Sequence, residues 1–315
     1  MLHRALGASG IDVSVLSLGS WRTYEHMSRE QGLAVMSAAR ECGIDFLDDA
    51  RYNDETGNAP LRTGYSEVVF GELFRSAGWR RDEVVVANKL WWEFWPEESA
   101  RQELDSSLRR MGFDHVDLIY ATTPPEGLGA AEIVESVGGL LSSGKARAWG
   151  VVNWPPELLA EAARLARSSG VPPPCAAQVA YNVIRRSPVE GAAAAAALSE
   201  AGVTVVASAV LAFGALTGKY ADPGATGRIA AKLDEPRVKE ALGAAPTLVD
   251  LATRSSTTPA ALAIAFAMAG ARVASVLFGA TRPEHVRENV GALDVDPAAV
   301  AELRRLLGDG TQAVR

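Results

Sequence analysis

The sequence predicts a single (β/α)₈ barrel. Its 315 residues contain eight short apolar segments, each followed by a stretch with the periodicity of a helix. Regular alternation of strand and helix indicates a parallel sheet, and eight such units are the number that closes a barrel. No Gly-x-Gly-x-x-Gly motif follows a strand, which disfavours the alternative of an open doubly wound sheet. No linker interrupts the pattern, so we predict one domain over residues 1–315.

The elements are expected in a simple order. Residues 2–13 predict a small hairpin that turns at Ala8-Ser9-Gly10. The barrel strands are expected at residues 15–19, 44–48, 84–89, 116–122, 146–152, 176–180, 204–207 and 274–277. Helices are expected at residues 32–42 (with Ser28 as a cap), 66–75, 97–111, 130–141, 157–167, 189–201, 259–269 and 283–292. A longer excursion spans residues 211–251, and a tail helix is expected at residues 297–307.

Composition narrows the class of partner. The formal net charge of −7 argues against binding to nucleic acid or to an anionic membrane. The two cysteines, Cys42 and Cys175, sit in apolar stretches, where buried free thiols are more typical than a disulfide. The N-terminus lacks an apolar signal region, and no apolar run is long enough to span a bilayer. We therefore expect a cytoplasmic protein that acts on a small molecule, without a prediction of its oligomeric state.

The stretch from Gly43 to Asn53 organises the predicted site. It reads as a helix end, a short buried strand and a polar loop, with Asp48 and Asp49 where the strand ends. Burying a carboxylate at this position costs free energy unless a cation pairs with it. Lys89, at the end of the next predicted strand, is the natural partner. We predict an Asp48–Lys89 pair, which alone would also fit a structural ion pair. Asp49 is expected to be solvated or to cap a helix.

In (β/α)₈ barrels the catalytic residues lie just after the strands. In this sequence, tryptophans are concentrated at these positions. Five of the seven tryptophans come after predicted strand ends. They are predicted to form a wall for a flat or apolar substrate, although loop packing is the alternative. This predicted substrate wall consists of Trp21, Trp91, Trp92, Trp95 and Trp154.

The segments after the strands together resemble the aldo-keto reductase superfamily over nearly the whole chain. The resemblance rests on the order and spacing of several motifs, each weak by itself. They are Arg4-Ala5-Leu6-Gly7, Leu18-Gly19-Ser20-Trp21, Gly43-Ile44-Asp45-Phe46-Leu47-Asp48, Gly150-Val151-Val152-Asn153-Trp154, Gln178-Val179-Ala180-Tyr181-Asn182, Gly214-Ala215-Leu216-Thr217-Gly218-Lys219-Tyr220 and Gly279-Ala280-Thr281-Arg282. The resemblance implies nicotinamide-dependent carbonyl reduction on a barrel.

The family's catalytic set of Asp, Tyr, Lys and His is matched only in part. Asp48 and Lys89 occupy the first and third of these positions. The family tyrosine lies five residues after the aspartate, which is Asn53 here, and Tyr52 is one residue early. Thr122 stands at the histidine position. The resemblance therefore implies an atypical proton relay, with Asp48, Lys89, Asn53, Thr122 and Tyr52 as candidate catalytic residues. Further candidates for the proton donor are Tyr24, Tyr65 and Tyr120, a bound water, and Lys89 itself.

The resemblance also implies that NADP(H) is the cofactor. Asn153 and Gln178 match the polar pair that binds the carboxamide, and Ser208 replaces a ring that stacks on nicotinamide. Arg282 beside a phosphate suits NADP(H) better than NAD(H). We predict no metal site. The implied cofactor-binding residues are Gly19, Ser20, Trp21, Asn153, Gln178, Ser208, Leu211, Gly214, Lys219, Arg228, Gly279, Thr281, Arg282, Glu288 and Asn289.

The sequence thus favours an NADP(H)-dependent oxidoreductase. The bond that receives hydride is left open among C=O, C=N and conjugated C=C, in a bulky or apolar small molecule. Two alternatives remain: a non-catalytic nucleotide-binding barrel with a regulatory role, and a lyase or isomerase on the same scaffold.

Overall fold

The computed structural model describes residues 1–54, 57, 59–222 and 224–308, and its strands form a closed barrel. All eight neighbouring pairs are parallel, in the order β10-β3-β4-β5-β6-β7-β8-β9, which confirms the predicted barrel rather than an open sheet. The strands are β3 (Leu16–Gly19), β4 (Phe46–Asp48), β5 (Val85–Leu90), β6 (Val116–Ala121), β7 (Ala146–Val152), β8 (Ala176–Ala180), β9 (Thr204–Ser208) and β10 (Val273–Phe278).

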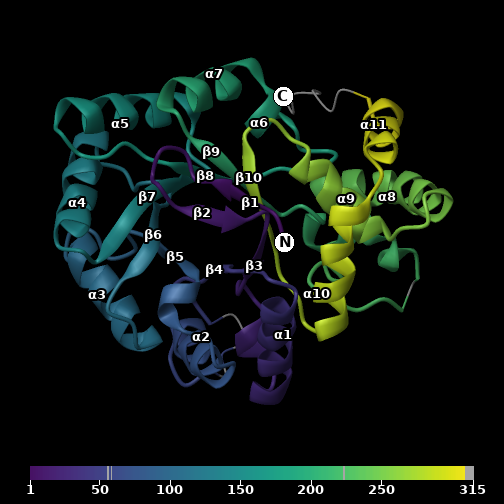
Figure 1. Cartoon of the computed structure of the whole chain (residues 1–315), viewed down its shortest axis with the longest axis horizontal. Coiled ribbons are helices and arrows are strands. Elements are labelled where there is room, and N and C mark those ends of the chain that lie inside the picture. The colour runs from purple at the N-terminus through teal and green to yellow at the C-terminus, as the bar shows by residue number, and fades with distance from the viewer. Residues whose placement is uncertain (55–56, 58, 223, 309–315) are drawn as a thin grey trace.

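Helices surround the barrel (Figure 1). They are α1 (Arg29–Glu41), α2 (Tyr65–Ser76), α3 (Ala100–Met111), α4 (Ala130–Ser142), α5 (Pro156–Ser168), α6 (Ser187–Glu190), α7 (Ala192–Ala201), α8 (Pro236–Arg254), α9 (Pro259–Met268), α10 (Pro283–Val290) and α11 (Pro297–Leu306). Ser28 caps α1 as predicted, in a reciprocal capping box with Gln31. No helix in the described part of the chain is long and apolar enough to cross a membrane.

Two stretches differ from the prediction in detail. The helix expected at residues 189–201 is two helices, because Gly191 takes an extended conformation between α6 and α7. A Cβ there would lie 2.6 Å from the carbonyl oxygen of Ser187, so only glycine fits this break. The excursion after β9 contains two short 3-10 helices, Ala212–Thr217 and Lys219–Ala221, followed by α8.

The predicted hairpin closes the N-terminal end of the barrel. β1 (His3–Ala5) pairs with β2 (Asp12–Ser14) in antiparallel register. Its buried side chains Leu6, Ile11 and Val13 pack into the same cluster as the residues that fill the barrel interior. The catalytic face is therefore expected at the opposite end.

Strand alternation decides which polar residues face the barrel interior. Phe46, Ala87 and Ala176 belong to the interior cluster. Side chains two residues further along a strand point to the same face. That rule places Asp48, Lys89 and Gln178 on the interior face. Asp48 ends β4, Lys89 is the last residue but one of β5, and Gln178 is the central residue of β8.

Candidate active site

Asp48 and Lys89 form a buried ion pair at the C-terminal end of the barrel. Their exposed fractions are 2% and 4%, and the Lys89 ammonium donates to Oδ1 of Asp48. The second oxygen, Oδ2, accepts a hydrogen bond from Nε2 of Gln178 at 2.9 Å. The predicted contact between Asp48 and Lys89 is therefore present, and both carboxylate oxygens have a donor.

Tyr52 extends this pair toward the mouth of the barrel. Lys89 Nζ donates to the Tyr52 hydroxyl oxygen at 3.3 Å and lies 5.7 Å from the centre of its ring. Tyr52 is half-buried, and its ring meets that of Trp91 edge to face at 6.0 Å. Burial raises the pKa of Tyr52 well above its ordinary value, and the charge of Asp48 adds to this shift. The raised pKa makes the phenol a weaker acid, and the Lys89 ammonium that donates to its oxygen is the group placed to stabilise its anion.

A tight turn explains how Tyr52 reaches Lys89 from only four positions after Asp48. The Tyr52 amide donates to the carbonyl of Ala50 at 2.9 Å, and the Tyr52 carbonyl accepts from the amide of Gly64 at 2.9 Å. The Ser66 hydroxyl also donates to the carbonyl of Ala50, at 2.8 Å. Both ends of the turn are thus tied to the start of α2.

The two unusual positions of the catalytic set lie beside this centre. Asn53 is exposed, and its side-chain amide donates to Glu93 at 3.3 Å rather than to Asp48 or Lys89. The Thr122 hydroxyl is buried and donates to the carbonyl of Leu90 at 2.8 Å. Its one proton is therefore engaged by the backbone.

The other candidate tyrosines are placed less well for proton transfer. Tyr120 is fully buried on β6, where it pairs in register with Lys89 of β5, and the Lys89 Nζ lies 6.0 Å from its ring centre. Tyr24 packs against Phe70 in the core, and burial raises its pKa. The Tyr65 hydroxyl accepts from Arg29 at 3.1 Å, at the start of α2.

Asp49 is fully buried, so the expectation of a solvated or capping carboxylate was wrong. Its Oδ1 accepts a hydrogen bond from the Ser20 hydroxyl, while Oδ2 has no partner among the described residues. Burial raises the pKa of Asp49 well above its ordinary value, and the nearby carboxylate of Glu67 raises it further. Burial therefore favours the protonated form of Asp49, and through Ser20 the carboxyl anchors the loop after β3.

Exposed aromatic side chains ring the mouth of the barrel. Trp21 and Phe213 make an edge contact at 5.6 Å, and Trp91 and Phe94 lie on the loop after β5. These four side chains are 37–47% exposed. Phe213 was missed by sequence reasoning, although its position shortly after the end of β9 was a usable signal.

The remaining tryptophans of the predicted wall are less exposed. Trp92 is 3% exposed and packs in the main core, so its predicted place in the wall was wrong. Trp154 is 8% exposed, and its indole donates to the Thr122 carbonyl at 2.8 Å. Trp95 is half-buried against the same core.

Three cations line one side of the mouth. Arg228 donates to the carbonyls of Trp21 and Arg22, at 2.7 and 3.1 Å. Lys219 lies 4.7 Å from the ring centre of Tyr220, and Arg282 contacts the His285 ring nitrogen at 2.7 Å. Within the described residues, Lys219, Arg228 and Arg282 form no ion pair with a carboxylate, so their charges remain available to an anion.

The backbone near these cations suits a phosphate group. A Cβ added to Gly279 would lie 3.3 Å from Cγ2 of Thr23 and 3.5 Å from Arg228, so a larger residue would fill the space beside that guanidinium. Next to it, a groove of about 540 Å³ runs between the starts of α1 and α10, with Ser28, Gln31, Thr281 and Arg282 in its lining. Amide groups at the start of α10 favour an anion there. The donors and charges present therefore fit the pyrophosphate and 2′-phosphate of NADP(H).

The other implied cofactor residues lie at the same end of the barrel. Asn153 has a left-handed backbone (φ 51°), and its Oδ1 accepts from the Ala180 amide at 3.3 Å. Gln178 is engaged by Asp48, so its role toward a carboxamide remains a prediction. A role in cofactor binding also remains a prediction for the other implied residues. They are Gly19 and Ser20 at the end of β3, Ser208 at the end of β9, Leu211 and Gly214 at the following 3-10 helix, and Glu288 and Asn289 in α10.

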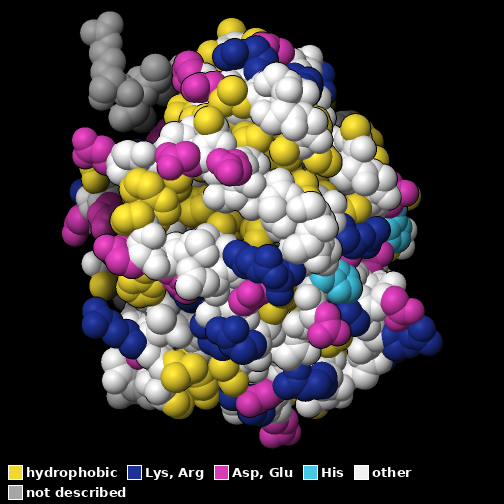
Figure 2. Space-filling model, turned by 90° about the vertical axis from the view of Figure 1, so that its left-hand side faces the viewer, with side chains coloured by type: hydrophobic (Ala, Val, Ile, Leu, Met, Phe, Trp, Pro, Cys, Tyr) yellow, Lys and Arg dark blue, Asp and Glu magenta, His cyan; other side chains and the backbone are white. Residues whose placement is uncertain are grey.

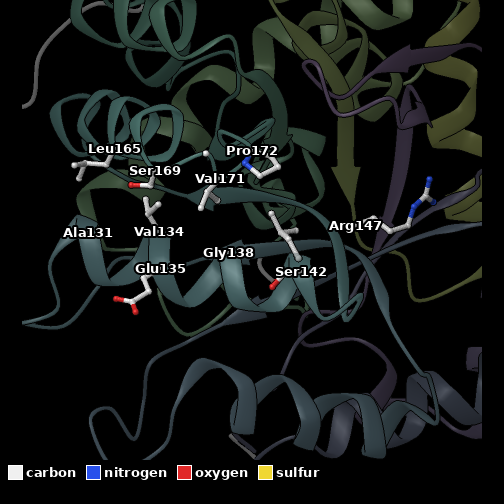
Figure 3. Close-up of a pocket in the computed structure, with 12 residues that line it drawn as sticks. Ala131, Val134, Glu135, Gly138, Ser142, Arg147, Leu165, Ser169, Val171 and Pro172 are labelled. Carbon is white, nitrogen blue, oxygen red and sulfur yellow. The ribbon is translucent and has the colours of Figure 1, made fainter.

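A larger groove on the outer surface is separate from this site. It has a volume of about 830 Å³ and lies between α4 and α5, with Val134, Leu165 and Val171 among its lining residues (Figure 3). Arg147, at the start of β7, places it toward the N-terminal end of the barrel. Figure 2 shows this side of the molecule, where hydrophobic side chains are most abundant in the upper half. The groove contains none of the candidate catalytic residues.

Comparison with known proteins agrees with this geometry. The model of the aldo/keto reductase family matches residues 15–307, so the chain belongs to that family. Two similar relatives are each named a probable voltage-gated potassium channel subunit beta. The protein from Oryza sativa subsp. japonica is 30% identical over 318 residues, covering 96% of this chain and 94% of the relative. The protein from Arabidopsis thaliana is 28% identical over 313 residues, covering 94% and 92%.

Proposed function

We propose that the protein is an NADP(H)-dependent oxidoreductase that reduces the carbonyl group of a small apolar molecule at the mouth of the barrel. The observation that carries this proposal is the contact of a half-buried tyrosine, Tyr52, with Lys89, which is itself paired with Asp48. This arrangement supplies an acid that a substrate reaches. It favours C=O over C=N or conjugated C=C, because a carbonyl oxygen needs a proton as hydride arrives at carbon.

Each residue of the centre has a distinct task. Asp48 supplies the counter-charge of the buried Lys89 ammonium, and this ammonium donates toward the Tyr52 oxygen. As Tyr52 gives its proton to the substrate oxygen, this ammonium stabilises the negative charge that develops on the phenol. When bound, the nicotinamide supplies the hydride. Thr122 offers no free proton, so Tyr52 acts as the main donor to the substrate oxygen.

The cations support NADP(H) rather than NAD(H). Arg282, Lys219 and Arg228 lie around Gly279 and the start of α10, where an additional phosphate would find charge and amide donors. An arginine beside a phosphate forms strong charge-assisted hydrogen bonds. We assign the 2′-phosphate contact to Arg282.

The aromatic rim supports an apolar, flat substrate. Trp21 and Phe213 form one side, and Trp91 and Phe94 lie on the loop that follows β5. Their large exposed fractions leave apolar area that a bound ring would cover. Aromatic aldehydes and ketones are the first substrates to test.

The proposal is tested by NADPH consumption against a panel of aromatic aldehydes, imines and enones, with NADH as the comparison. We expect turnover of aldehydes with NADPH. Turnover confined to imines or enones would replace the carbonyl assignment, and no turnover by a protein that binds NADPH would contradict enzymatic activity.

The names of the relatives favour a second candidate, in which the barrel binds a cofactor and associates with a membrane channel. Such a protein would bind NADPH without needing rapid turnover. Tight NADPH binding with negligible consumption across the panel, together with capture of a channel subunit, would support this candidate over the first.

A further inference from the structure

A buried arginine lies immediately before the proposed proton donor. The side chain of Arg51 is only 3% exposed and is surrounded by carboxylates. Its guanidinium lies 3.0 Å from Glu98, 3.2 Å from Glu103 and 3.9 Å from Glu93. The ring of Phe94 lies 5.1 Å from its central carbon. The loop after β4 is thus tied to the loop after β5 and to α3.

Glu103 is the central acceptor of this network. Its Oε1 accepts from Arg51 at 3.2 Å and from the amide of Trp91 at 2.7 Å, and its Oε2 accepts from the amide of Trp92 at 3.2 Å. Glu103 is 1% exposed, and burial raises its pKa against the opposing effect of the Trp91 amide. One carboxylate therefore fixes two backbone amides beside Lys89 and the arginine beside Tyr52.

The hydrogen bonds and ion pairs of Arg51 and Glu103 stabilise the turn that the short spacing between Asp48 and Tyr52 requires. Tyr52 follows Asp48 by four positions, and the tight turn from Ala50 to Tyr52 brings its hydroxyl to Lys89. Arg51 is the central residue of that turn, so anchoring its side chain restricts the backbone on both sides. Trp91, whose ring contacts Tyr52, is held by the same carboxylate.

We propose that Arg51 and Glu103 are positioning residues that hold Tyr52 against Lys89 and Trp91 against Tyr52, an inference that rests on the proposed role of Tyr52 as proton donor. A displacement of about 1 Å at a reacting group can cost about 10²-fold in rate. The pair therefore contributes to the chemical step through Tyr52 without contact with the substrate.

The test compares Glu103→Gln with a matched control, Asp117→Asn. Asp117 is 1% exposed, accepts the Val86 amide and contacts two arginines, so it resembles Glu103 in burial and donors. It lies at the other end of the barrel, at the start of β6. We expect Glu103→Gln to lower kcat for an aromatic aldehyde by about 10²-fold with an unchanged KM for NADPH, and Asp117→Asn to leave kcat unchanged. Equal kcat in the two variants would overturn the inference.

A second readout does not depend on activity. The ionisation of Tyr52 is measured as the difference between the alkaline absorbance titrations of each protein and of its Tyr52→Phe counterpart. Release of Tyr52 from its half-buried place beside Asp48 should move its pKa down toward the ordinary value in Glu103→Gln but not in Asp117→Asn. An unchanged titration of Tyr52 in Glu103→Gln would contradict the positioning role of Glu103, whether or not the wild type turns over a substrate. Absence of turnover by the wild type would contradict only the proposed function.

A gentler variant covers the case in which Glu103→Gln does not fold. Arg51→Lys keeps the charge but removes the planar fork that reaches both Glu98 and Glu103. It should show the same fall in kcat and the same downward shift in the pKa of Tyr52. A variant with wild-type kcat and titration would overturn the inference.

Discussion

Each end of the barrel carries a buried carboxylate that is bonded to cations. At the N-terminal end, Asp117 lies 2.7 Å from both Arg81 and Arg147 and accepts the Val86 amide at 2.9 Å. At the C-terminal end, Asp48 pairs with Lys89 and accepts from Gln178.

The two ends differ in the other contacts that the paired cations make. Arg81 otherwise donates to two backbone carbonyls and lies over the ring of Phe113, and Arg147 is largely exposed, so this cluster joins neighbouring elements of the barrel. Lys89 instead contacts the hydroxyl of a half-buried tyrosine. Burial of an ion pair is therefore no sign of catalysis by itself, and the reachable acid beside it distinguishes the two ends.

The largest expected effect is on kcat, and it distinguishes the C-terminal end of the barrel from the N-terminal end. Lys89→Met removes the charge that stabilises the Tyr52 phenolate, so kcat for an aromatic aldehyde should fall by about 10²–10⁴-fold. Asp117→Asn should lower stability but not kcat. Steady-state assays below both unfolding temperatures check this, and a matching loss in Asp117→Asn would erase the proposed distinction.

The second effect concerns stability. Asp48→Ala leaves the buried Lys89 ammonium without its carboxylate and should cost about 3–5 kcal/mol in the free energy of unfolding. Adding Lys89→Met should then cost much less than it does in the wild type. Urea unfolding of the four proteins of this double-mutant cycle measures the coupling, and simple additivity would argue against the contact.

Cofactor affinity should show a smaller effect. Arg282→Ala should weaken NADP(H) binding by about 1–3 kcal/mol, because it removes charge-assisted hydrogen bonds to the 2′-phosphate. Binding of NAD(H) should be unchanged. Titration of intrinsic tryptophan fluorescence with both cofactors checks the difference, and an equal loss for both would remove Arg282 from the 2′-phosphate site.

A further expected effect depends on pH. The raised pKa of Asp49 means that the folded protein binds more protons than the unfolded chain above the ordinary pKa of an aspartate. The contribution of Asp49 to the free energy of unfolding is therefore present at acid pH. It is lost as the pH rises toward the raised pKa of the folded state. Asp49→Asn does not titrate, so its stability relative to the wild type should increase from pH 5 to pH 8 in urea unfolding. A constant difference would show that Asp49 is ionised throughout.

The sequence predicted the barrel well because local patterns specify it. Short apolar runs such as the one at β6 and capped helices such as α1 are visible without tertiary information. The break at Gly191 was missed because the alanine-rich stretch that follows it favours a continuous helix, whereas the close approach of the Ser187 carbonyl is a property of the folded chain.

The site was predicted in part, for a similar reason. The Asp48–Lys89 pair follows from two strand ends, but the reach of Tyr52 depends on a turn that a count of residues does not reveal. Asp49 appeared solvated because it is adjacent to a polar loop, yet its side chain is buried beside Ser20 and Glu67. Glu103 had one usable signal, since helical periodicity places it on the buried face of α3 with Ala100 and Leu104.

The central claim is that Tyr52, rather than the residue at the family's usual spacing, donates the proton. It is tested most directly by comparing Tyr52→Phe with its neighbour Asn53→Ala in NADPH-dependent reduction of an aromatic aldehyde, with NADPH affinity measured on the same samples. We predict that Tyr52→Phe lowers kcat by about 10²–10⁴-fold while retaining NADPH affinity, and that Asn53→Ala retains wild-type kcat. A Tyr52→Phe protein with wild-type kcat, or an equal loss in Asn53→Ala, would contradict the claim.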